Sequence, residues 1–214
     1  MAVTAEAAHR EEIANAITHG IGALASAAAG AVLVTLATLH GTRLQMISAI
    51  IFCSSLVLLY TSSTLYHAIP SPAAKRRLKV FDHCAIYMLI AGTYTPFALI
   101  GLRGAVGWWL FGVSWGLAAI GMTFKLFFTG RFKLFSTLVY IGMGWMVVFA
   151  IRPMIENIPL SALVWLVVGG VAYTAGTLFY HNEKLRYSHA MWHLFVLAGS
   201  TCHFVAVISQ VVPV

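Results

Sequence analysis

Seven predominantly apolar stretches run along this chain, and each is long enough to cross a lipid bilayer as a helix. A hydrocarbon core about 30 Å thick takes about 20 helical residues, and backbone groups within lipid must find hydrogen-bond partners inside the same segment. The expected spans are, approximately, residues 17–39, 44–66, 82–102, 105–128, 134–151, 161–180 and 190–211. They predict an all-α, polytopic membrane protein that folds as a bundle of seven transmembrane helices.

The composition indicates the same class of protein. Hydrophobic residues make up 60% of the 214 positions and charged residues only 9%, whereas soluble domains carry about 25% charged residues. Residues 1–214 are expected to form a single transmembrane domain, with residues 1–16 as a polar cytoplasmic segment that lacks the pattern of a cleavable signal. The three cysteines lie inside apolar stretches without a CxxC pair, so we interpret them as small buried side chains.

Lysine and arginine predict the orientation, because cytoplasmic loops carry an excess of these residues. If the N-terminus is cytoplasmic, ten of the 13 fall inside: Arg10, Lys75, Arg76, Arg77, Lys79, Lys125, Arg131, Lys133, Lys184 and Arg186. Only Arg43, Arg103 and Arg152 fall outside, so the C-terminus is expected outside. This orientation is opposite to that of G-protein-coupled receptors and argues against that class. The net charge of +7 then reflects topology and contact with lipid headgroups, not binding of nucleic acid.

With this topology, polar side chains gather at the cytoplasmic end of the bundle. His67 ends the second span, with Ser63 one turn deeper on the same face. Asp82, the only aspartate, begins the third span. His189 and His193 share one face at the start of the seventh span, a spacing with which paired histidines bind metal in zinc enzymes. Three imidazoles suit zinc, so these three histidines are predicted to bind Zn²⁺, although copper, iron or nickel would accept the same ligands.

Glu12, Asn15 and His19 repeat at helical spacing in the first span and form a stripe at the same membrane level. Ionisable groups at membrane depth are costly, and they usually face a cavity or one another. Each site residue nevertheless has a structural alternative. His67 and His189 could be interfacial residues, Asp82 could cap its helix, and Ser63 could bond its own backbone.

Other residues are interpreted without a role at the metal. His203 lies about 15 Å deeper in the seventh span, as a hydrogen-bonded bundle histidine or as part of a proton or water path. His83 points about 100° away from Asp82 around the helix and is not counted as a ligand. We expect His9, His40 and His181 to be solvated. Gly112 and Gly116 have GxxxG spacing, which we interpret as helix packing within the chain, with a dimer face as the alternative.

Four stretches of the chain resemble the hemolysin III proteins, the bacterial branch of the progestin and adipoQ receptor family. They are EEIANAITHGIG at 11–22, SSTLYHAIP at 62–70, FDHCAIYMLIAGTYTPF at 81–97 and HAMWHLFVLAGSTCHF at 189–204. The resemblance implies a seven-helix fold with the N-terminus inside. It also implies that zinc is held by His67, His189 and His193, that Asp82 contacts the metal through a water, and that Ser63 lies beside it.

The family resemblance also implies a role in membrane lipid or fluidity homeostasis. One hypothesis is a zinc-dependent hydrolase of lipid amide or ester bonds, resembling ceramidases, in which Asp82 is the general base and Ser63 assists. A second is a non-enzymatic sensor in which zinc is structural, and a third is a pore-forming hemolysin. Each hypothesis places a multi-pass protein in the cell membrane with membrane lipids as partners, and none predicts the oligomeric state.

Overall fold

The computed structural model describes residues 5–182 and 184–212. Its α-helices are α1 (Ala5–His40), α2 (Arg43–Ala68), α3 (Pro72–Pro96), α4 (Gly104–Phe128), α5 (Lys133–Gly144), α6 (Ile151–Asn157), α7 (Leu160–Tyr180) and α8 (Ser188–Val211). A π-helix, η1 (Phe97–Leu102), continues α3, and a 3-10 helix, η2 (Trp145–Ala150), joins α5 to α6. The described residues form seven apolar helical segments long enough to cross a membrane. The expected all-α, multi-pass architecture is confirmed.

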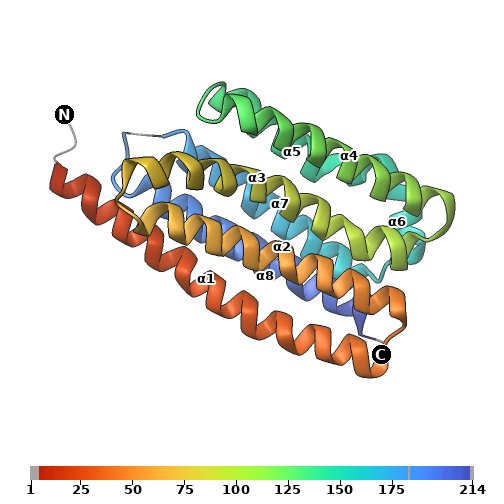
Figure 1. Ribbon diagram of the computed structural model, residues 1–214. Coiled ribbons are helices and arrows are strands. Elements are labelled where there is room, and N and C mark those ends of the chain that lie inside the picture. The colour runs from red at the N-terminus through yellow and green to blue at the C-terminus, as the bar shows by residue number, and fades with distance from the viewer. Residues whose placement is uncertain (1–4, 183, 213–214) are drawn as a thin grey trace.

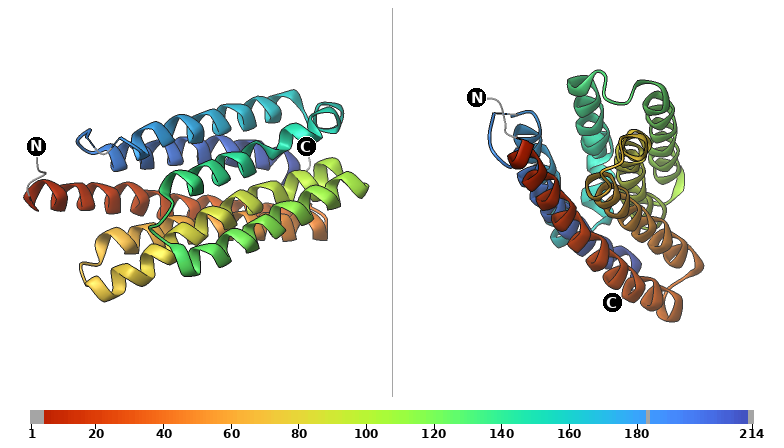
Figure 2. Two further views of the ribbon diagram at one scale, coloured as in Figure 1. Left: turned by 90° about the horizontal axis from the view of Figure 1, so that it is seen from above. Right: turned by 60° about the vertical axis from the view of Figure 1, so that its left-hand side comes forward.

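The long helices run side by side, with the two chain ends at opposite ends of the bundle (Figure 1). α1 lies against α2 and α8, α2 against α3, α3 against α4, and α7 against α8. α5 contacts α3 on one side and α7 on the other, and the views in Figure 2 show α4 and α5 on the side of the bundle away from α1. Helices that are distant in sequence, α1 and α8, therefore become neighbours.

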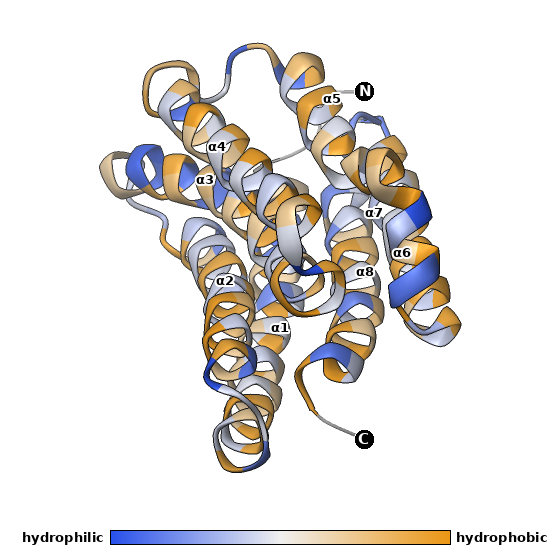
Figure 3. Ribbon diagram, turned by 90° about the vertical axis from the view of Figure 1, so that its right-hand side faces the viewer, coloured by the Kyte–Doolittle hydropathy of each residue, from blue (hydrophilic) through white to orange (hydrophobic). Residues whose placement is uncertain are grey.

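The polarity of the bundle is that of a membrane protein. Large apolar side chains are exposed along the helices, for example Leu24 on α1 and Val171 on α7, while many buried residues are polar, including Asn15, Ser55 and Thr95. Figure 3 shows apolar ribbon over most of each helix and hydrophilic residues mainly near the helix ends and in α6. Apolar side chains facing outward are stable in lipid, whereas a water-soluble protein would expose a large aggregating surface.

Several helices extend beyond the spans expected from the sequence. The described part of the N-terminal polar segment is helical from Ala5, so α1 begins well before residue 17. α3 begins at Pro72, not near 82, because proline is favoured in the first turn of a helix, where a missing N–H costs nothing. The fifth span continues through η2 and α6 to Asn157. As a result Asp82 lies inside α3, and the alternative that it caps this helix is wrong.

The interpretation of the glycine pair is also wrong. A methyl group added at Gly112 or Gly116 would meet no atom within 4 Å, so both positions of α4 face open space. The close approaches within the chain occur elsewhere: at Gly22 of α1, an added Cβ would lie 2.6 Å from the ring of Tyr60 and 2.8 Å from Leu197. Gly22 therefore lets α1 approach α2 and α8, the two helices that carry the three histidines.

Candidate metal centre

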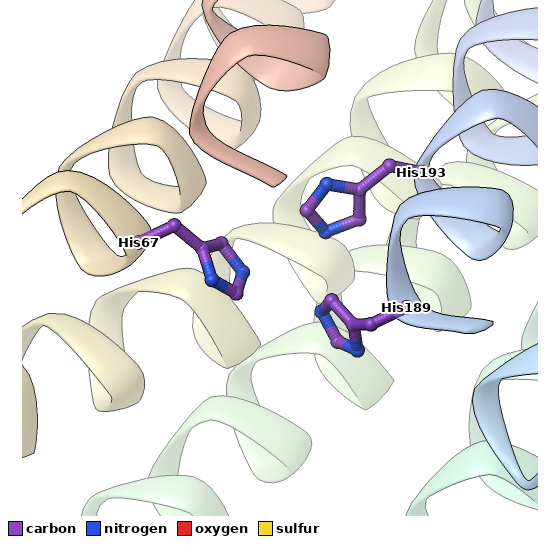
Figure 4. Close-up of side chains that lie close together, drawn as sticks. All are labelled: His67, His189 and His193. Atoms are coloured by element: carbon purple, nitrogen blue, oxygen red, sulfur yellow. The ribbon is translucent and has the colours of Figure 1, made fainter. Parts of the chain in front are cut away.

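Three histidine side chains converge at one end of the bundle, which we call the histidine end (Figure 4). His67 comes from the last turn of α2, and His189 and His193 come from the first two turns of α8. One nitrogen of each ring lies within 4.8 Å of the other two. Small rotations of the rings would bring these three nitrogens close enough to bind a single metal ion. The group is largely buried and could hold a metal ion.

The partners of two ring nitrogens determine which nitrogens remain free. His67 Nδ1 lies 3.3 Å from Glu12 Oε1, and an ionised carboxylate can only accept, so Nδ1 donates. His193 Nδ1 lies 3.3 Å from the backbone oxygen of Asn15, which also only accepts. In both rings the lone pair is therefore on Nε2, and His67 Nε2 is buried without a hydrogen-bond partner. A carboxylate or carbonyl behind Nδ1 is the usual support of a metal-binding histidine, so this donor set fits a metal ion.

Most of this support comes from α1. The Thr18 hydroxyl lies 3.2 Å from His193 Nδ1 and can accept its N–H. The Asn15 side-chain nitrogen lies 3.5 Å from His67 Nδ1, but both groups are donors, so the support for His67 comes from Glu12. Glu12 also pairs with Lys75 of α3, so a single carboxylate joins α1, α2 and α3. The stripe predicted at Glu12, Asn15 and His19 does lie at the level of the three histidines.

Two supporting residues were not predicted. Thr18 contacts His193, and a carboxylate oxygen of Glu11 accepts the backbone N–H of His189 at 3.2 Å. The first-helix pattern contained a usable signal, because Glu11 and Thr18 lie seven residues apart and so share a helix face. Without the structure, neither residue had an identifiable partner on α8.

His19 is a fourth imidazole beside the three. Its ring stacks on the ring of His193, with centroids 3.5 Å apart and planes 10° apart. Its Nδ1 lies 2.7 Å from the hydroxyl of Ser63, and its Nε2 is buried without a partner. His19 nevertheless lies outside the group that could share one metal ion among the described residues.

Ser63 and Asp82 lie beside the histidines. Ser63 is 1% exposed, its hydroxyl contacts His19, and it lines the same cavity as Asp82, His189 and His193. Asp82 is largely buried and is outside the three-histidine group. His83, which we did not count as a ligand, is also outside that group; its Nδ1 contacts the backbone oxygen of Lys79 at 2.8 Å. Ser63 is therefore bonded to α1 through His19, and Asp82 of α3 shares the cavity with both residues.

These residues open onto a cavity of about 560 Å³ inside the bundle. Ser63, Asp82, His189 and His193 line its histidine end, and its deeper walls are mainly apolar. Side chains from α2, α3, α4, α5, α7 and α8 contribute to the wall, with Leu163 among the deepest. The volume is in the range of small-molecule sites, and the combination of apolar walls with a few polar groups is typical of binding sites.

The remaining histidines lie apart from this cluster. His203 contacts the backbone oxygen of Leu166 at 3.1 Å and the ring of Tyr173, so it is a hydrogen-bonded bundle histidine, as predicted. His9 and His40 are exposed, and His181 is exposed while its Nε2 lies 2.9 Å from the Thr137 hydroxyl.

Comparison with known proteins gives a consistent result. The family model described as Haemolysin-III related matches residues 7–204. The chain is 48% identical to Hemolysin-3 of Bacillus cereus, covering 95% of this chain and 93% of the relative. It is 46% identical to the Hemolysin-3 homolog of Bacillus subtilis, covering 96% of each. A more distant relative is the human monocyte to macrophage differentiation factor, 26% identical over 76% of this chain and 70% of that protein. The chain belongs to the Haemolysin-III related family of multi-pass membrane proteins.

Proposed function

We propose that this protein is a zinc-dependent hydrolase of amide or ester bonds in membrane lipids. The observation that supports this most is the position of the three imidazoles, which meet next to a serine and an aspartate at one end of an apolar cavity. His67, His189 and His193 would hold zinc, since three imidazoles with one open position are the usual ligands of a catalytic zinc. The reaction would contribute to lipid homeostasis of the cell membrane, with the histidine end facing the cytoplasm.

The chain's own residues have distinct roles in this proposal. When bound, zinc supplies Lewis acidity, which polarises a carbonyl and makes water a stronger acid. Asp82 lines the cavity, and in this proposal it takes a proton from water and returns it to the leaving group. Ser63 contacts His19 and lines the cavity with Asp82, where its hydroxyl would assist the reaction. Glu12 holds the ring of His67 in position, and the backbone oxygen of Asn15 holds the ring of His193.

We expect a lipid to enter the cavity between α5 and α7. A second, shallower pocket lies at the surface of these two helices. Thr137, Ile141 and Thr177 line both this pocket and the main cavity, so a single layer of side chains separates them. A lipid in the surrounding leaflet would need to displace only these side chains to bring its carbonyl toward the histidines.

A pore is a weaker candidate. The name of the Bacillus cereus relative, Hemolysin-3, refers to lysis of cells, and a pore requires a polar lining across the bilayer. In the described residues, the walls of the cavity beyond the histidine end are formed mainly by side chains such as Leu89, Phe97, Leu110 and Leu163. An apolar wall of this kind would bind a lipid acyl chain better than it would line a water-filled pore.

The test is turnover by the purified, zinc-loaded full-length protein. Detergent micelles containing ceramides or phospholipids would be incubated with the wild type, His193→Ala and His9→Ala, and released fatty acid would be measured by mass spectrometry. His9 is an exposed histidine of α1 and serves as the matched control. We expect release by the wild type and by His9→Ala and none by His193→Ala. Zinc that stabilises the bundle while the wild type releases no more fatty acid than His193→Ala would show a structural zinc and reject the hydrolase.

A further inference from the structure

The cavity contains a group of positive charges that the proposed hydrolysis does not use. Four of the residues that line it are lysine or arginine, whereas a single lining residue, Asp82, is acidic. Three of these cations come from different parts of the fold: Lys79 from α3, Lys125 from α4, and Arg131 from the turn between α4 and α5. All three lie at the histidine end, where α3 begins and α4 ends.

Lys125 is the strongest evidence that this cluster is more than a topology signal. Lysines at helix ends usually extend to the headgroup region, which leaves the ammonium group solvated. Lys125 is instead 1% exposed, and its Nζ donates to the Ser136 hydroxyl of α5 at 2.6 Å, with the ring of Tyr140 5.9 Å away. Its charge is therefore directed into the bundle, and both partners are neutral.

Lys79 and Arg131 extend this positive region. The Nζ of Lys79 lies 3.4 Å from the position that a Cβ would take at Gly130, so this side chain reaches across from α3 to the α4–α5 turn. Arg131 is the next residue in that turn and also lines the cavity. A buried charge is costly unless it is paired, so the buried ammonium group of Lys125 favours an anion in this part of the cavity.

The glutamates that the structure describes interact with groups outside this cluster. Glu6 pairs with Arg10, Glu12 with Lys75, and Glu156 with Arg152. Glu11 accepts the backbone N–H of His189, and Glu183 lies outside the described residues. Asp82 lies 3.7 Å from His83 Nδ1 and interacts with the charge of Lys79. Among the described residues, Lys125 and Arg131 form no ion pair with a carboxylate.

We propose that Lys125, Lys79 and Arg131 form a subsite for the phosphate group of a lipid whose chain lies in the apolar part of the cavity. Phosphate matches this set, because lysine and arginine donors from three directions can bind its several oxygens. The proposal builds on the proposed function in that it assigns the substrate class, an anionic phospholipid. The binding itself requires neither zinc nor turnover.

The test compares ligands that share a chain and differ in headgroup. The purified full-length protein in nonionic detergent, with its metal removed, would be titrated with hexadecyl phosphate, hexadecylphosphocholine and inorganic phosphate, and binding would be followed by microscale thermophoresis. The variants are Lys125→Gln, Arg131→Gln and, as matched control, Arg77→Gln. Arg77 is an exposed cation of α3 at the same end, and it is not among the residues that line the cavity.

We expect hexadecyl phosphate to bind more tightly than hexadecylphosphocholine and inorganic phosphate to bind weakly. Lys125→Gln should weaken hexadecyl phosphate binding by about tenfold or more, because a buried charged donor is lost. Arg131→Gln should show a smaller loss, and it remains informative if Lys125→Gln does not fold. Equal binding of both lipids, equal losses in Arg77→Gln and the cavity variants, or inorganic phosphate binding as tightly as the lipid would overturn the proposal. A failure of hydrolysis would leave each of these outcomes unchanged.

Discussion

At the histidine end, polar side chains from α1, α2 and α8 contact one another across helices. At the opposite end of the bundle, which we call the far end, most polar contacts lie within a single helix. Glu12, Asn15 and Thr18 of α1 reach histidines that are more than 50 residues away in sequence. At the far end, Thr42 and Gln45 form a capping box at the start of α2, and Arg152 pairs with Glu156 one turn away.

The far end also has a contact between helices, in which the Gln45 side chain donates to the backbone oxygen of Gln210 at 3.2 Å. Contacts within one helix, such as the capping box at Thr42, satisfy the free backbone groups that every helix end has. Buried ionisable groups that converge from distant segments satisfy no such need and are costly at membrane depth. The difference between the two ends therefore indicates that the cluster at the histidine end serves a function.

The largest effect should follow from Asp82→Asn. If Asp82 is the general base, turnover should fall by about 100- to 10,000-fold, while the zinc content stays unchanged because Asp82 is outside the three-histidine group. The matched control is Glu156→Gln, a carboxylate-to-amide change at the far end. Fatty-acid release and elemental analysis of the same samples give both quantities. Full activity in Asp82→Asn would remove this residue from the mechanism.

A smaller effect should follow from Glu12→Gln, which weakens the acceptor behind His67 Nδ1. Loss of such a partner typically lowers metal affinity by about 10- to 100-fold. Glu6→Gln, which removes an exposed carboxylate two turns earlier on α1, should leave the affinity unchanged. Competition with a zinc-chelating dye measures the affinity, and equal values for the two variants would show that α1 does not tune the site.

Gly22→Ala tests whether the site depends on the close approach of α1. The added methyl group would lie 2.6 Å from the ring of Tyr60, so the helices must separate. Overpacking of this kind costs about 1–3 kcal/mol, and we expect a lower melting temperature. Gly116→Ala meets no atom within 4 Å and is the matched control. A Gly22→Ala variant as stable as Gly116→Ala would contradict this arrangement of α1.

The smallest effect should come from Thr42→Ala at the far end. Removing this cap should cost about 1 kcal/mol of stability, because its hydroxyl accepts the backbone N–H of Gln45. Zinc affinity should be the same as in the wild type. Denaturant unfolding and dye competition check both statements, and a loss of zinc affinity would show that the two ends are coupled.

The sequence predicts the seven spans and the meeting of the histidines well, for a physical reason. Apolar length is encoded locally, and the distribution of lysine and arginine places residues 67, 189 and 193 at one end once helices alternate in direction. Helix ends are harder to predict, because the first turns of α3, which contain Pro72 and Lys75, are polar and carry no apolar signal.

Side-chain direction is the other part that the sequence could not provide. Lys125 was interpreted only as a topology signal, since its place in the chain does not show that it turns into the bundle. The spacing of Gly112 and Gly116 likewise gave no information about which face of α4 meets a neighbour. Thr18 and Glu11 became identifiable as supporting residues only when α8 was seen next to α1.

The most direct test is X-ray absorption at the zinc edge on the purified protein and on His67→Ala. The account predicts zinc in the wild type, bound by three imidazole nitrogens at about 2.0–2.1 Å, and loss of this signal in the variant. Zinc bound through sulfur, or an unchanged spectrum in His67→Ala, would contradict it.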